Sequence, residues 1–320
     1  MLDKFAELPL VAVPIGSMAE TSVAEAVEKV CRDQRLSNVR LLRQSMNAVY
    51  QAEGSSGPIV MRVCRPTTDS SVAIEFAQFL ARRGFEVPAP VGHRAFRHDE
   101  IEISLWEFID HDHTQIADWS VIGTAVKHLH AIDPAEVAVF YPLAKATSFP
   151  WWDFSKILAE LTSTFGAGDH KILTDRWQEL EPMLLEAGQV SLGDNNIQHG
   201  VLCHGDVHPG NVLVHRRTGR PILIDWDLLC VAPAQWDHSA LLTWSSRWGG
   251  AENIYDEFVR GYGRDFGLDS LAIALAELRL LSATLMRWRA GSSSPTAKVE
   301  ADRRMQWWRK DPNAPMWTAQ

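Results

Sequence analysis

The amino-acid sequence predicts an α+β protein of two lobes, with a β-rich amino-terminal lobe and a mainly helical carboxy-terminal lobe. Short β-prone runs joined by a Gly/Ser turn occupy the first third of the chain, and apolar residues recur at helical spacing over most of the remainder. The length of 320 residues suits two domains or one domain with two lobes. We place the lobes at residues 1–108 and 109–320, with a linker near residues 107–113.

The amino-terminal lobe is predicted to contain an antiparallel sheet and two helices. Apolar side chains at helical spacing indicate the helices, and β-rich runs of four to nine residues indicate the strands. A Gly/Ser turn at residues 53–57 joins two of these strands as a hairpin. The predicted helices are 17–33 and 70–83, and the predicted strands are 39–42, 48–52, 58–63 and 101–109.

The carboxy-terminal lobe is predicted to be helical except for one hairpin. Its two short β-like runs, 211–214 and 221–224, flank a turn at residues 216–220. A Gly/Ser stretch at residues 291–295 is expected to be a short connector. The predicted helices are 122–132, 154–165, 175–186, 235–244, 252–262 and 269–288.

The charge of the chain argues against nucleic acid and anionic membrane surfaces as partners. It carries 31 basic and 40 acidic side chains, a net charge of −9, whereas binding to phosphate backbones relies on Lys and Arg. Residues 109–286 hold 12 basic and 23 acidic side chains, a net charge of −11. This segment is either a solvated acidic face or a site that attracts a cationic ligand.

Cysteine usage and hydropathy indicate a cytoplasmic protein. The four cysteines lie far apart and form no C-x-x-C pair, which predicts neither a zinc site nor a disulfide framework. The apolar stretch at residues 8–15 contains two prolines and follows two acids, unlike the core of a signal peptide. No run approaches the roughly 20 apolar residues of a membrane span.

The most informative stretch is His204-Gly-Asp-Val-His-Pro-Gly-Asn211, followed by a strand-terminal Asp225. Asp206 and Asn211 lie five residues apart across a Pro-Gly loop, so their side chains can converge on one side of a tight turn. Asp225 ends the hairpin that Asn211 begins. Two carboxylates and an amide suit Mg²⁺, and the order H-x-D-x-x-x-x-N and then Asp is the phosphotransfer arrangement of kinases.

These residues resemble the signature of the aminoglycoside phosphotransferase family, a branch of the protein-kinase-like fold, over residues 37–290. The Gly after His204, the second His and the sequence Asp225-Trp-Asp227 distinguish it from protein kinases. No activation segment follows Asp225. The resemblance implies that Asp206 is the catalytic base and that Asn211 and Asp225 hold Mg²⁺.

The same resemblance implies a site for ATP or GTP in the amino-terminal lobe. Asn47, within the run 45–50, belongs to the turn that covers the nucleotide, although this turn has no glycine. Arg62 takes the place of the strand lysine that holds the phosphates, and Glu75, 13 residues later, is its expected ion-pair partner. Glu107 and Ile109 belong to the hinge whose backbone pairs with the purine.

Acceptor-site candidates are less specific. His208 lies in the catalytic loop, and Asp227 is either a further metal contact or part of the acceptor site. The run Trp151-Trp152-Asp153 is a candidate aromatic wall against a cation or sugar. His204 is expected to pack under the catalytic loop, and Asp237 to fix its helix through a buried hydrogen-bonded pair.

The leading hypothesis is a phosphotransferase that moves the γ-phosphoryl group of ATP or GTP to a hydroxyl of a small cationic molecule such as an aminoglycoside antibiotic. A housekeeping kinase for choline, ethanolamine, a sugar or an amino alcohol is the alternative within this fold. A catalytically weak nucleotide-binding regulator is the alternative from another class, supported by the glycine-free turn and Arg62. The sequence does not decide the acceptor, the choice between ATP and GTP, or the oligomeric state.

Overall fold

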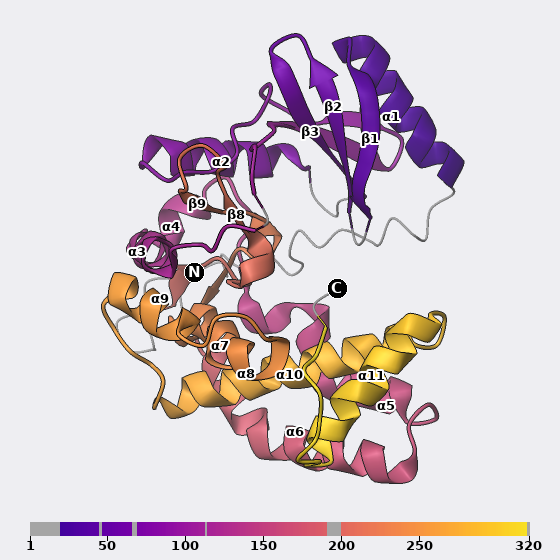
Figure 1. Ribbon diagram of the computed structural model, residues 1–320, viewed down its shortest axis with the longest axis vertical. Coiled ribbons are helices and arrows are strands. Elements are labelled where there is room, and N and C mark those ends of the chain that lie inside the picture. The colour runs from indigo at the N-terminus through magenta and orange to yellow at the C-terminus, as the bar shows by residue number, and fades with distance from the viewer. Residues whose placement is uncertain (1–19, 45–46, 66–68, 113, 191–199, 319–320) are drawn as a thin grey trace. The chain divides into compact units, whose positions relative to one another are not determined.

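The computed structural model describes residues 20–44, 47–65, 69–112, 114–190 and 200–318 of the chain. The chain divides into two compact units (Figure 1). Unit 1 contains the described residues up to Ala117 together with Glu136–Leu143 and Val212–Leu228. Unit 2 contains Asp118–Ala135, Ala144–Asn211 and the chain from Leu229 onward. The hairpin at residues 212–223 therefore groups with unit 1, and the lobe boundary at residue 108 stays a prediction.

Unit 1 is built on a five-stranded antiparallel sheet of order β1-β2-β3-β5-β4. The predicted hairpin between β2 and β3 is confirmed, with Gly54 paired to Gly57. Gly57 has a φ of +121°, which residues with a Cβ rarely adopt. The elements of this sheet and its helices are α1 (Glu20–Gln34), β1 (Ser37–Gln44), β2 (Ala48–Gly54), β3 (Gly57–Cys64), α2 (Ser71–Arg82), β4 (Phe96–His98) and β5 (Ile101–Glu107).

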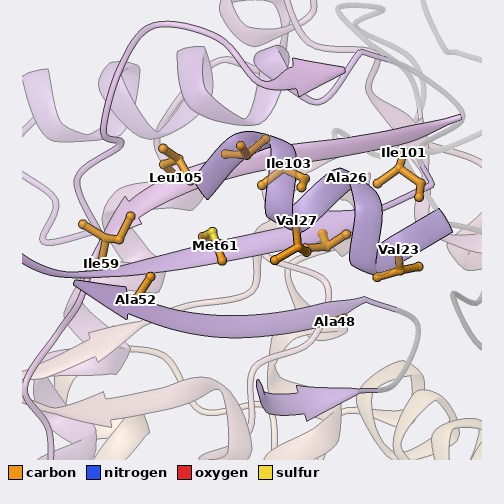
Figure 2. Close-up of a cluster of buried hydrophobic side chains, with 12 residues drawn as sticks. Val23, Ala26, Val27, Ala48, Ala52, Ile59, Met61, Ile101, Ile103 and Leu105 are labelled. Carbon is orange, nitrogen blue, oxygen red and sulfur yellow. The ribbon is translucent and has the colours of Figure 1, made fainter. Parts of the chain in front are cut away.

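The core of unit 1 lies between α1 and the sheet (Figure 2). Val23, Ala26, Val27 and Val30 recur at helical spacing and are buried, so α1 presents one apolar stripe. Alternate residues of the central strands meet this stripe, and Met61 is fully buried beneath it. Residues 1–19, which include the apolar stretch 8–15, lie outside the described part of the chain.

The second hairpin of unit 1 is formed by β8 (Val212–Val214) and β9 (Pro221–Leu223). Val212 pairs with Leu223, as the two β-like runs of the sequence predict. Beyond β9 the chain passes through Asp225 into a short 3₁₀ turn, Trp226–Leu228. Asp225 has a φ of +65°, a left-handed conformation that Asp tolerates better than most residues.

Unit 2 is mainly helical, with one small three-stranded sheet of order β6-β10-β7. Its strands have only two or three residues each and were not predicted. The predicted helices are confirmed, and α8 and α11 are additional. The elements are α3 (Trp119–His130), β6 (Ala144–Lys145), α5 (Phe154–Leu161), α6 (Ala167–Ala187), β7 (Val201–Cys203), β10 (Cys230–Ala232), α7 (Gln235–Leu242), α8 (Trp244–Trp248), α9 (Ile254–Tyr262), α10 (Ser270–Ala290) and α11 (Pro295–Trp308), and the four-residue α4 (Pro134–Val137) lies where the two units' ranges meet.

Several helices of unit 2 begin at side-chain caps. The carboxylates of Asp118, Asp153 and Asp269 accept hydrogen bonds from backbone N–H groups in the first turns of α3, α5 and α10. The predicted connector at residues 291–295 is a turn between α10 and α11, and Ser294 caps α11. None of the described helices combines the length and the apolar composition needed to cross a membrane.

Candidate active site

The loop after β7 brings Asp206 and Asn211 together in unit 2, as their spacing predicts. Nδ2 of Asn211 donates to the backbone oxygen of Asp206 at 2.9 Å and to its Oδ2 at 3.1 Å. Because a carboxylate only accepts hydrogen bonds, the amide orientation of Asn211 is fixed chemically. Its Oδ1 accepts no hydrogen bond from the residues that the structure describes, so this oxygen is available as a ligand.

His208 contacts the Asp206 carboxylate from within the loop. Its Nδ1 accepts a hydrogen bond from the backbone N–H of Gly210 at 3.0 Å, so in the neutral ring the proton is on Nε2. Nε2 then donates to Oδ2 of Asp206 at 3.2 Å. A Cβ on Gly210 would lie 2.8 Å from Cε1 of His208, so the loop needs glycine here. Both ring nitrogens of His208 therefore form hydrogen bonds within this loop and stabilise its conformation.

Arg279 of α10 provides a cation beside Asp206. Its Nη1 lies 3.6 Å from Oδ1 of Asp206, and its other nitrogens donate to Ser239 Oγ and to the carbonyl oxygens of Gly205 and Trp236. Burial alone would raise the pKa of Asp206, but His208 and Arg279 outweigh it and hold that pKa well below its usual range. The carboxylate is thus ionised at neutral pH.

A buried network beneath the loop fixes its backbone. The two oxygens of Asp237 accept hydrogen bonds from the backbone N–H groups of His204 and Gly205, both at 2.8 Å, and one oxygen also contacts Nε2 of His130 at 3.1 Å. Asp237 and His204 are fully buried. The predicted structural roles of His204 and Asp237 are confirmed. His130, Cys203 and Asp237 could also group around a metal ion, but their polar atoms already make these internal contacts.

Within unit 1, Asp227 is the centre of a second polar cluster. Its Oδ2 accepts hydrogen bonds from Nη2 of Arg62 and, at 3.1 Å, from Nδ2 of Asn47. The preceding carboxylate, Asp225, lies 3.5 Å from Nη2 of Arg43 and accepts no other side-chain hydrogen bond among the described residues. Asp227 therefore orients Arg62 and Asn47, and its predicted role as a metal contact or part of the acceptor site stays a prediction.

The predicted ion pair between Arg62 and Glu75 is wrong. Glu75 is exposed on α2, between the buried Ile74 and Phe76, and forms no ion pair with any described residue. The rotation of α2 that buries Ile74 and Phe76 leaves Glu75 exposed to solvent. Arg62 has Asp227 as its partner instead.

The remaining nucleotide-site residues have distinct environments. Ser45 and Met46 of the predicted nucleotide turn lie outside the described residues. Glu107 ends β5, and its N–H donates to the Ala89 carbonyl oxygen at 2.8 Å, so this group is already used. The N–H of Ile109 donates to no group in the described part of the chain. Of the two predicted hinge residues, Ile109 retains a free backbone donor.

The run Trp151-Trp152-Asp153 is largely used in packing and helix capping, and its predicted role as an aromatic wall stays a prediction. Trp152 is buried and packs against Trp236, with ring centroids 4.6 Å apart. Asp153 is committed to capping α5, and the half-buried Trp151 stacks on Phe149. The ring that does stack on His208 is Trp244 of α8, at 5.0 Å and nearly parallel. Sequence reasoning missed Trp244 because tryptophan is common in helix packing.

The carboxylates of residues 109–286 are mostly used within the chain. Besides the helix caps, several form ion pairs with Arg residues from outside the segment, which the net charge does not count, as Glu160 does with Arg289 and Asp169 with Arg309. The net charge of −11 therefore overstates the negative charge that is available to a ligand. Arg279 was also missed, although a charged residue between Leu278 and Leu280 in an apolar helix was a signal.

These are elements of a kinase-like fold: in unit 2 a loop joins Asp206 to Asn211, and in unit 1 a hairpin leads to Asp225. A profile of the phosphotransferase enzyme family matches residues 39–281, and the chain belongs to this family. No curated protein matched the sequence.

Solved structures of kinase-like phosphotransferases share the α+β fold. Spectinomycin phosphotransferase APH(9)-Ia, in complex with ADP and spectinomycin, is 15% identical with a TM-score of 0.61, covering 89% of this chain and 93% of that one. APH(2″)-IIIa with GDP and kanamycin is 15% identical with a TM-score of 0.62, covering 90% and 98%. A Plasmodium vivax ethanolamine kinase is 14% identical with a TM-score of 0.59, covering 92% of each chain.

Proposed function

We propose that this protein transfers the γ-phosphoryl group of ATP or GTP to a hydroxyl group of a small molecule. The observation that carries the proposal is the Asp206 carboxylate, which is ionised and held by Asn211 and His208. In phosphoryl transfer the protein mainly positions the reactants and stabilises charge. Asp206 would accept a hydrogen bond from the acceptor hydroxyl, orient it, and receive its proton as the new O–P bond forms and the bond from the γ-phosphorus to the leaving ADP or GDP breaks.

The oxygen atoms of Asn211 and Asp225 fit a hard cation such as Mg²⁺. Oδ1 of Asn211 and the Asp225 carboxylate both retain unused acceptor capacity among the described residues. When bound, Mg²⁺ would neutralise charge on the nucleotide phosphates. Arg62 would contact the phosphates, oriented by Asp227, and Ile109 would donate its backbone N–H to the purine.

The assignment is tested by replacing Asp206 with Asn, which keeps the shape of the side chain but removes its charge. We expect D206N to lower kcat at least about a hundredfold, because positioned acid–base groups contribute roughly 10²–10⁴-fold. The affinity for ATP, measured by calorimetry, should stay within about twofold, since an isosteric change leaves nucleotide contacts intact. The control is Asp175→Asn on α6, the same substitution at a residue outside the catalytic loop, and it should keep full activity. Retained turnover in D206N would refute the role.

For the acceptor we propose first a cationic amino compound. The excess of acidic residues in 109–286 supports it, as do the kanamycin, spectinomycin and ethanolamine named with the similar structures. Arg279 supports a second candidate, a neutral hydroxyl compound, because a cation 3.6 Å from Asp206 repels an ammonium group nearby. Structural neighbours include macrolide 2′-phosphotransferases.

An ADP- and GDP-release assay over aminoglycosides, amino alcohols and macrolides separates these candidates. Saturable release with amines supports the first candidate, and release with macrolides alone supports the second. Nucleotide binding without turnover on any acceptor would favour the regulatory protein that remains the alternative from another class.

A further inference from the structure

Four aromatic rings in unit 2 connect the carboxy-terminal segment to the catalytic loop. His208 stacks on Trp244 at 5.0 Å between centroids, with an interplanar angle of 7°, and Trp244 stacks on Trp248 at 5.6 Å and 22°. Trp317 meets Trp248 edge-on at 5.3 Å. We call His208, Trp244, Trp248 and Trp317 the ring column.

The end of the ring column farthest from His208 is tightly anchored. Trp317 is buried, and its backbone N–H donates to the carbonyl oxygen of Arg247 in α8 at 2.7 Å. The next residue, Thr318, donates its N–H and Oγ1 to the carboxylate of Glu300 at 2.9 and 2.7 Å. Its carbonyl oxygen accepts from Nη2 of Arg304 at 3.1 Å. The segment Asp311–Thr318 is therefore fixed against both α8 and α11.

A buried cation stabilises the same end of the column. The guanidinium of Arg304 lies 4.8 Å from the ring centroid of Trp248 and 5.1 Å from that of Trp317. Arg304 is buried, donates to Glu300 at 2.9 Å and donates to the Ala283 carbonyl oxygen at 2.7 Å. Desolvated cation–π contacts are stronger than exposed ones, so Arg304 restrains both rings.

The other end of the ring column contacts the carboxylate of Asp206, the proposed catalytic base. The ring of His208 is fixed in its plane by two hydrogen bonds, to Gly210 and Asp206, and against rotation out of that plane by Trp244. A rotation of the His208 ring would break its bond to Oδ2 of Asp206. The stacking of Trp244 thus adds to Asn211 and Arg279 in setting the direction of the Asp206 carboxylate.

We propose that Trp244, Trp248 and Trp317 are positioning residues, through which the segment Asp311–Thr318 holds His208 and aims Asp206 at the acceptor. The catalytic consequence rests on the proposed function, whereas the mechanical connection from Trp317 to His208 does not. None of these three tryptophans needs to touch the nucleotide, so their loss should affect the rate of transfer rather than nucleotide binding.

The test compares Trp317→Ala, Trp317→Phe and a control, Trp177→Ala. Trp177 is a buried tryptophan of α6 that packs on Phe154 and lies outside the ring column. We expect Trp317→Ala to lower kcat about five- to tenfold, the effect of losing one aromatic contact in the supporting shell. The KM for nucleotide should remain within about twofold, because no nucleotide contact is removed. Trp317→Phe retains an edge-on ring and should restore most of kcat.

The control separates positioning from general destabilisation. Trp177→Ala should lower Tm at least as much as Trp317→Ala, yet keep kcat. Equal losses of kcat in the two alanine variants, or no rescue by Trp317→Phe, would overturn the proposal.

An NMR measurement distinguishes failure of the proposal from failure of the proposed function. The ring resonances of His208, assigned with His208→Gln, should shift in Trp317→Ala and not in Trp177→Ala. If the wild-type protein transfers phosphate to no acceptor, the proposed function fails, but this comparison still tests the ring column. Unchanged His208 resonances in Trp317→Ala would overturn the connection whether or not the protein is active.

Discussion

His238 of α7 should make the stability of unit 2 depend on pH. Its ring is fully buried, and four aromatic rings meet it edge-on at 4.4–5.9 Å. Nδ1 contacts the hydroxyl of Tyr255 at 3.3 Å, and Nε2 has no partner among the described residues. Burial lowers the pKa of His238 to about 3. An imidazolium here would have nowhere to place its second proton.

The neighbouring charges modify this effect without reversing it. His130 and Arg264 lower the pKa of His238 further, whereas Asp237 and Asp265 raise it. The unfolded chain, with a histidine pKa of about 6.5, binds a proton at mildly acidic pH that the folded chain does not bind. Stability is therefore complete above pH 6.5 and is lost progressively as the pH falls toward 3.

The loss can be worked out for a drop from pH 7.5 to pH 5.5. At pH 5.5, about one pH unit below the unfolded pKa, the unfolded chain binds nearly one more proton at His238 than the folded chain does. Over the whole drop in pH, this difference in proton binding lowers the free energy of unfolding by about 1.4 kcal/mol. Urea unfolding followed by circular dichroism at both pH values measures it. His238→Phe keeps an aromatic ring and removes the titration, so its loss between the two pH values should be about 1.4 kcal/mol smaller. Parallel losses in the two proteins would refute the reasoning.

Two further predictions concern helix packing and nucleotide binding. Gly261→Ala should destabilise the fold by about 2 kcal/mol, because its Cβ would overlap the Ser120 carbonyl oxygen and this cost of about 3 kcal/mol exceeds the roughly 1 kcal/mol gained from helix propensity. Gly168→Ala, in open space on α6, is the control for thermal unfolding and should not destabilise. Arg62→Gln should weaken ATP binding about tenfold in calorimetry, since a charged hydrogen bond is worth roughly 1.5–3 kcal/mol; unchanged affinity would show that Arg62 serves only Asp227.

Most helices and strands were predictable because the spacing of their apolar residues repeats over short stretches of sequence. The apolar stripe of α1 and the alternation along β2 and β3 each depend on residues that are close in sequence. The sheet β6-β10-β7 has no such pattern. Its strands are two or three residues long and pair across intervals of tens of residues, so no window of sequence contains the signal.

In the candidate site, too, contacts between residues close in sequence were predictable and contacts between distant segments were not. Asp206 and Asn211 are five residues apart, and a single tight loop was enough to bring them into contact. The pairing of Arg62 depended instead on the rotation of α2 and on a residue 165 positions away, Asp227. Trp244 and Arg279 reach His208 and Asp206 from separate helices, and neither belongs to a motif.

The net charge of a segment is a poor guide to the hydrogen bonds that a ligand can form, because many carboxylates spend their acceptor capacity within the fold. Asp118 is committed to capping a helix, and Asp237 is committed to the backbone of the catalytic loop. Asp225 keeps most of its capacity, and Asp206 shares its charge with Arg279. In the proposed function Asp225 serves a metal ion and Asp206 a hydroxyl, so selection of the acceptor would come from groups beyond the motif.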